Sequence, residues 1–106
     1  MIVVLCPGQG SQKPGFLNEW LELPEFRKQF VELSDSVAID LIKHGTISDE
    51  ETIRDTAVAQ PLIVASGIAT AALLNLAGIS GVAGHSVGEV SAASIAGVIS
   101  NQDAMR

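Results

Sequence analysis

Ser86 is the residue of this chain whose surroundings most favour covalent chemistry. It lies in Gly84-His85-Ser86-Val87-Gly88, a G-x-S-x-G pattern, after the short apolar run 81–83 and before the small-residue segment 89–99. This order of strand, sharp turn and helix is what a nucleophile elbow requires. Side chains at the two glycines would collide with the neighbouring strand or helix, because the turn is so tight.

The pattern predicts an exposed Ser86 hydroxyl at the N-terminus of a helix, where free N–H groups favour negative charge. The backbone N–H of Val87 would then help to hold a tetrahedral oxyanion. The alternative is a serine that only caps the helix. The correct flanking pattern favours the nucleophile.

Two strands and their loops must position this turn. Residues 2–6 form a continuous apolar run with β-branched residues, which predicts a parallel strand buried on both faces. The glycine-rich loop 7–12 follows it, where ligand sites of parallel sheets usually lie. This loop lacks the phosphate-binding patterns G-x-G-x-x-G and G-K-[ST].

Helices should cover the sheet. Pro24 fits the first turn of a helix whose apolar stripe is Phe26, Phe30, Leu33 and Val37. Residues 48–51 resemble a capping box with Ser48 as the N-cap.

A second, very apolar helix should begin at Gln60-Pro61, with Pro61 as its first residue and Gly78 just beyond its end. No Asp, Glu, Lys or Arg occurs in residues 56–88, which raises the possibility of a membrane span. Interruptions by Pro61, Ser66, Gly67 and other residues favour a buried core helix followed by a buried strand.

Composition limits the remaining possibilities. A chain of 106 residues forms at most one domain, and a net charge of −6 argues against nucleic acid or an anionic membrane as partner. Cys6 is the only cysteine, so no internal disulfide can form, and a buried thiol is favoured over a nucleophilic one. We expect no metal site, because no neighbouring residues complete a ligand set around the acidic stretch 48–51. With no leader pattern before the first strand, we expect a cytoplasmic setting.

Three segments together resemble the signature motifs of malonyl-CoA:acyl carrier protein transacylases. They are Pro7-Gly8-Gln9-Gly10-Ser11-Gln12, Gln60-Pro61 and Gly84-His85-Ser86-Val87-Gly88-Glu89, and the stretch 55–61 is similar to free-standing actinobacterial members. The resemblance implies an α/β fold: part of an α/β-hydrolase-like parallel sheet flanked by helices, with a strand–elbow–helix at Ser86. It runs along the whole chain.

The resemblance also implies a reaction. Ser86 would take the malonyl group from malonyl-CoA and pass it to the phosphopantetheine thiol of acyl carrier protein, as in fatty acid biosynthesis. Backbone N–H groups of Gln9 and Val87 would hold the oxyanion, while Gln60 and His85 would line the substrate pocket. No permanently bound cofactor is implied. From the residues alone, Gln60 also fits a simple helix-terminal role.

Family members are well over twice as long, so the resemblance implies that residues 1–106 are the N-terminal part of one acyltransferase domain. The general base, a carboxylate-binding arginine, a ferredoxin-like subdomain and further strands would lie elsewhere. We expect such a piece alone to be inactive, to expose an apolar patch, and to self-associate or pair with the rest of its domain. Alternatives are an acyltransferase domain of a polyketide or multidomain fatty acid synthase, a serine esterase, or a non-catalytic binding module.

Overall fold

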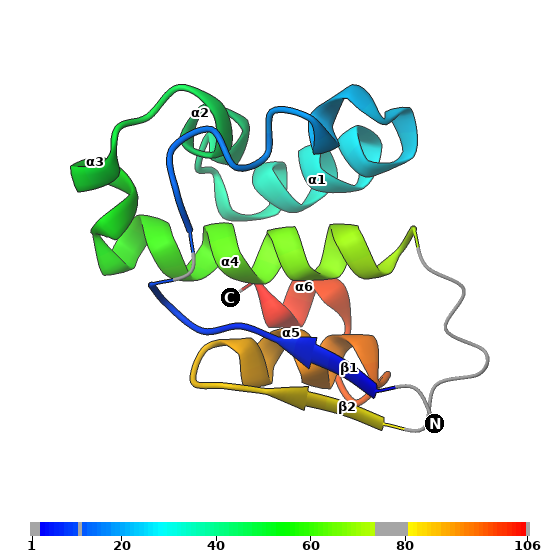
Figure 1. Ribbon diagram of the computed structural model, residues 1–106. Helices are drawn as coiled ribbons and strands as arrows, with labels where there is room; N and C mark the ends of the chain where they lie inside the picture. Colours follow the sequence, from blue (N-terminus) through cyan, green and yellow to red (C-terminus); the bar gives the residue numbers. More distant parts are fainter. Residues whose placement is uncertain (1–2, 11, 74–80, 106) are drawn as a thin grey trace.

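The chain folds into a helical layer above a short parallel sheet, with one long helix between them (Figure 1). The computed structural model describes residues 3–10, 12–73 and 81–105. The elements in chain order are β1 (Val3–Cys6), η1 (Trp20–Glu22), α1 (Pro24–Val37), α2 (Leu41–Thr46), α3 (Glu50–Arg54), α4 (Thr56–Ala71), β2 (Gly81–Gly84), α5 (Gly88–Ile95) and α6 (Asn101–Ala104).

Helix α1 begins and packs as its sequence predicts. Pro24 occupies the first turn, where its missing N–H has no intrahelical partner to lose. Phe26, Phe30 and Leu33 are buried against the core, and Val37 is half-buried at the end of the same stripe. The helix ends at Val37, and its C-cap Ala38 has a left-handed φ of 55°.

Helix α4 lies at the centre of the molecule and contributes Leu62, Val64 and Ile68 to the core. The prediction that Pro61 is its first residue is wrong. The helix begins at Thr56, because the carboxylate of Asp55 accepts a hydrogen bond from the Ala57 N–H at 3.0 Å and caps the helix five residues earlier. Pro61 therefore lies inside the helix. Gly78, expected just beyond the end of this helix, lies outside the described residues.

The N-cap of α3 also differs from the sequence prediction. Asp49, not Ser48, accepts a hydrogen bond from the backbone N–H of Thr52, at 2.8 Å. Ser48 is buried and its hydroxyl is instead hydrogen-bonded to Nδ1 of His44 at 2.9 Å. The hydrogen bond to His44, four residues earlier in the chain, therefore occupies the hydroxyl that a capping box would use, and the helix begins one residue later.

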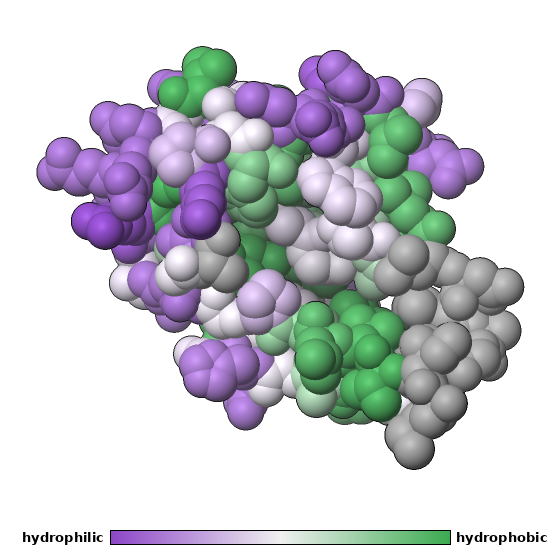
Figure 2. Space-filling view, viewed as in Figure 1, coloured by the Kyte–Doolittle hydropathy of each residue, from purple (hydrophilic) through white to green (hydrophobic). Residues whose placement is uncertain are grey.

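The sheet consists of β1 and β2, paired in parallel with Cys6 opposite Gly84. Helix α5 packs on it (Figure 1). The expectation that residues 2–6 are buried on both faces is wrong for the part described, since Val3 is 47% and Leu5 76% exposed. These two side chains share one face because strand residues alternate. Hydrophobic residues gather on the surface over the sheet (Figure 2).

Among the helices of residues 3–10, 12–73 and 81–105, none is long and apolar enough to cross a membrane. Helix α4 buries Leu62, Val64 and Ile68 in the protein core.

Candidate active site at the turn before α5

The turn after β2 has the strained backbone of a nucleophile elbow. Ser86 adopts a φ of 56°, in the left-handed region that residues other than glycine rarely enter. Helix α5 then begins two residues later, at Gly88. A Cβ at Gly84 would collide with the Gly88 backbone, and one at Gly88 with the carbonyl oxygens of Cys6 and Pro7. Both glycines are therefore required by close backbone approach, as the sequence predicts.

The loop after β1 lies directly beside this turn. The N–H of His85 donates to the carbonyl of Cys6 at 3.1 Å, which ties the turn to the end of β1. A Cβ built at Gly8 would lie 2.6 Å from the His85 carbonyl oxygen and 3.3 Å from Cβ of Ser86. Because β1 and β2 are parallel, both loops leave the same end of the sheet, as expected.

The hydroxyl of Ser86 is available to a ligand. Ser86 is exposed, and within the described part of the chain its hydroxyl has no hydrogen-bond partner. The N-cap position of α5 belongs to Val87, which makes no side-chain cap. The simple capping role considered for Ser86 is therefore wrong, because the serine precedes the cap position.

The backbone amides of Gln9 and Val87 belong to the two segments that meet at the serine. Gln9 follows Gly8, which contacts the turn, and Val87 follows Ser86 itself. Among the residues that the structure describes, neither amide N–H donates a hydrogen bond. Two free N–H donors at one end of the sheet are the groups that an oxyanion would need.

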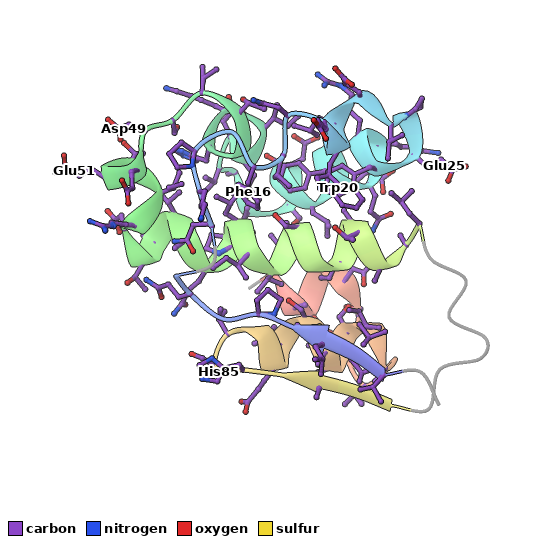
Figure 3. The ribbon with its side chains drawn as sticks, in the orientation of Figure 1. Phe16, Trp20, Glu25, Asp49, Glu51 and His85 are labelled. Atoms are coloured by element: carbon purple, nitrogen blue, oxygen red, sulfur yellow. The ribbon has the colours of Figure 1, made fainter. Side chains whose placement is uncertain are left out.

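Gln60 and His85 are both exposed. Gln60 lies in the second turn of α4, next to Pro61, so the helix-terminal role considered for it is wrong. It borders a groove of about 660 Å³ that Val87 and Val90 also line, whereas Ser86 itself is not among the lining residues. His85 lies outside that lining, at the turn between β2 and α5 (Figure 3).

Cys6 ends β1 and is buried. Burial raises the pKa of its thiol above the ordinary value of 9.0, because desolvation disfavours the thiolate. The thiol is therefore a poor nucleophile at neutral pH. In residues 3–10, 12–73 and 81–105, no group of three or more His, Cys, Asp or Glu side chains is arranged to hold a metal ion.

The sequence did not indicate the role of the Gln12 side chain at this site. Its side-chain Oε1 accepts from the Gly10 N–H at 2.8 Å, and its Nε2 donates to the Ile53 carbonyl at 2.9 Å. Its partner Ile53 is 41 positions away in the chain, so no local spacing could have indicated the contact. Only the concentration of polar residues in the loop pointed to it.

Comparisons with known proteins identify the family of this chain. The acyl transferase domain family matches residues 3–106. The chain is 48% identical to the malonyl CoA-acyl carrier protein transacylase of Mycobacterium tuberculosis (strain ATCC 25618 / H37Rv) over 99% of its length, and covers 36% of that protein. It is 40% identical to the phenolphthiocerol synthesis polyketide synthase type I Pks15/1 of Mycobacterium marinum, over 95% of this chain and 5% of that protein.

A crystal structure of MCAT from Mycobacterium tuberculosis superposes with a TM-score of 0.92 at 49% identity, covering 99% of this chain and 36% of that one. The chain thus spans about a third of the length of the transacylase that it matches. The match extends over nearly every residue, including the turn at Ser86 and the loop after β1. The chain therefore belongs to the acyl transferase domain family.

Proposed function

We propose that this chain carries the nucleophile of a malonyl-CoA:acyl carrier protein transacylase that acts in fatty acid biosynthesis. The observation that carries the proposal is the exposed Ser86 on its left-handed turn, against which Gly8, the neighbour of Gln9, packs. Identity of 48% to a malonyl CoA-acyl carrier protein transacylase, along 99% of the chain, supports the choice of substrates.

The proposed reaction has two acyl transfers. The Ser86 oxygen attacks the thioester carbonyl of malonyl-CoA and loses its proton to a base, and the tetrahedral intermediate expels the CoA thiolate. The phosphopantetheine thiol of acyl carrier protein then attacks the malonyl-serine ester and releases the serine. In both steps the carbonyl oxygen becomes negative, and the N–H groups of Gln9 and Val87 would stabilise it.

The groove beside the turn is the proposed place for the acyl group. It opens between the first turns of α4 and the start of α5, and Gln60 lies on its border with Val87. The amide of Gln60 can donate to or accept from polar atoms of a bound acyl chain. His85 lies outside the lining of this groove, so we propose that it contacts the substrate at the exposed turn itself.

We further propose that residues 1–106 are the N-terminal part of one acyltransferase domain, whose sheet is of the α/β-hydrolase-like kind. Ser86 has no base among its hydrogen-bond partners in the described residues, so the base would come from the rest of the domain. Without it we expect the isolated chain to lose about 10⁴-fold or more in rate, by analogy with the loss of triad members.

The uncovered sheet face supports association. Val3 and Leu5 expose 47% and 76% of their surface on one side of β1. Water contact with such a patch is unfavourable, so the isolated chain should self-associate or pair with the remaining part of its domain. Sedimentation of the isolated chain tests this, and a monodisperse monomer would contradict it. The cytoplasmic location expected from the sequence stays a prediction.

Covalent labelling tests the proposed nucleophile. The complete protein is incubated with radiolabelled malonyl-CoA, and the label is located by peptide mass spectrometry. We expect one labelled peptide containing Ser86, and no label in Ser86→Ala. Ser36→Ala is the matched control, because Ser36 is an exposed serine on α1. Labelling that survives Ser86→Ala excludes Ser86 as the nucleophile, and no labelling of the wild type favours a non-catalytic binding module.

The 40% identity to a polyketide synthase favours one second candidate, an acyltransferase domain of such a multidomain enzyme. The two candidates differ in the acceptor of the acyl group. Transfer from the labelled enzyme to a free-standing acyl carrier protein supports the first, and transfer only to a carrier domain of a synthase supports the second. Release to water alone would indicate a serine esterase.

A further inference from the structure

We propose that Gln12 is a positioning residue for the oxyanion site, acting through the backbone of the loop after β1. The inference rests on the proposed function, since it concerns the same reaction. It assigns to one side-chain amide the task of fixing the segment that carries the Gln9 N–H.

The side chain of Gln12 joins two separate parts of the backbone. Its Oε1 accepts from the N–H of Gly10, and its Nε2 donates to the carbonyl of Ile53, at 2.8 and 2.9 Å. Gly10 has a φ of 109°, a conformation open to glycine and strained for other residues. A flexible residue directly after Gln9 needs an external contact if the loop is to keep one shape.

The side chain of Gln9 also connects the loop after β1 to the segment that follows Ile53. Nε2 of Gln9 lies 3.3 Å from the hydroxyl oxygen of Thr56 and 3.5 Å from the Arg54 carbonyl, to which it donates. Both glutamine side chains therefore attach the loop to the junction between α3 and α4. On its other side, the loop is held by contact between Gly8 and the turn at His85.

These contacts indicate that Gln12 holds the backbone at Gln9 in place. The backbone at Gln9 lies between Gly8, packed on the nucleophile turn, and Gly10, bonded to Gln12. The Gln9 N–H donates no hydrogen bond to any of the described residues. Stabilisation of an oxyanion depends on donors that are already in position, so a shift of the loop lowers the rate of acyl transfer with little change in substrate binding.

The test is a comparison of variants in the complete protein with malonyl-CoA and acyl carrier protein. Gln12→Met keeps the length of the side chain and removes both hydrogen bonds. We expect kcat to fall roughly 10- to 100-fold with KM nearly unchanged. Gln12→Glu keeps the acceptor for Gly10 and loses the donor to Ile53, so we expect a smaller loss. Gln29→Met, a half-buried glutamine on α1, is the matched control.

The melting temperature separates positioning from stability. If Gln12→Met lowered kcat only in proportion to its folded fraction, or if its kcat equalled that of Gln29→Met, the inference would be overturned. Should Gln12→Met fail to fold, two other measurements test the inference. They are the kcat of Gln12→Glu and the rate of hydrogen exchange at the Gly10 amide of the wild type. A kcat of Gln12→Glu equal to the wild type, or rapid exchange at Gly10, would overturn the inference.

The same experiment distinguishes the two failures. Wild-type protein that neither transfers malonyl groups nor becomes labelled at Ser86 contradicts the proposed function, and the inference with it. Active wild type with an unaffected Gln12→Met contradicts the inference alone.

Discussion

Gly88 is packed so closely against the carbonyl oxygen of Cys6 that a Cβ atom at this glycine would overlap it. The first residue of α5 thus lies directly against the last residue of β1. This contact connects the two halves of the candidate site, because Ser86 is two residues before Gly88 and the loop with Gln9 follows Cys6. The spacing between the serine and that loop depends on a glycine.

Gly88→Ala should therefore destabilise the protein. A Cβ would meet backbone atoms, which cannot rotate away as a side chain can, and overpacking of this kind costs about 1–3 kcal/mol or more. Thermal denaturation measures the effect. Gly81→Ala is the control, because among the described residues beyond its chain neighbours no atom lies within 4 Å of a Cβ built at Gly81. Equal melting temperatures for the two variants would show that α5 can move away from β1.

The left-handed backbone at Ser86 predicts an unusual order of stability. Ser86→Gly should be more stable than Ser86→Ala by about 1 kcal/mol, because only glycine adopts a φ of 56° without strain. Ser36, inside α1, should give the opposite order, since glycine disfavours a helix by about 1 kcal/mol relative to alanine. Chemical denaturation of the four variants measures both differences. The same order at both positions would contradict the strained turn.

Asp49 should make the stability depend on acid pH. Hydrogen bonds from the side chain and backbone N–H of Thr52 lower the pKa of its carboxyl below the ordinary value of 3.8. A lowered folded pKa adds stability above the unfolded pKa, and this contribution is lost as the pH falls from about 5 through the folded value.

Asp49→Asn keeps an N-cap acceptor without a titrating charge, so we expect a flatter profile of stability against pH below 5. Urea denaturation at a series of pH values measures the slope. Glu32→Gln, which removes one charge from an exposed position of α1, is the control. If Asp49→Asn and wild type lose stability equally between pH 5 and 3, Asp49 does not contribute to the acid response.

The thiol of Cys6 should react slowly in the native protein. Its pKa is raised by burial, so less thiolate is present near neutral pH than in the unfolded chain. We expect alkylation of the peptide containing Cys6 by iodoacetamide at pH 7.5 to be much faster in guanidinium chloride than in native buffer, followed by mass spectrometry. Similar rates in the two conditions would mean that the end of β1 opens readily.

Local chemistry was enough to predict several elements. Pro24 and the apolar stripe of α1 identified that helix, because a helix that buries one face has apolar residues with a period of 3.6. The glycines around Ser86 identified the sharp turn, because only a residue without Cβ fits where backbones touch. The two helix starts were misplaced, since Asp55 and Asp49 compete with Pro61 and Ser48 for the same role, and local hydrogen bonds of the two aspartates to Ala57 and Thr52 decided between them.

By itself, the sequence determined that a serine stands on a glycine-bounded turn between a strand and a helix, since steric exclusion at neighbouring positions is a local property. The tertiary structure alone decided which groups meet that serine. Gly8 contacts the turn from 78 positions away, and Gln12 reaches Ile53 across 41. Such contacts depend on how strands and helices pack, because hydrogen-bond donors and acceptors separated this far in the chain carry no spacing that would identify their partners.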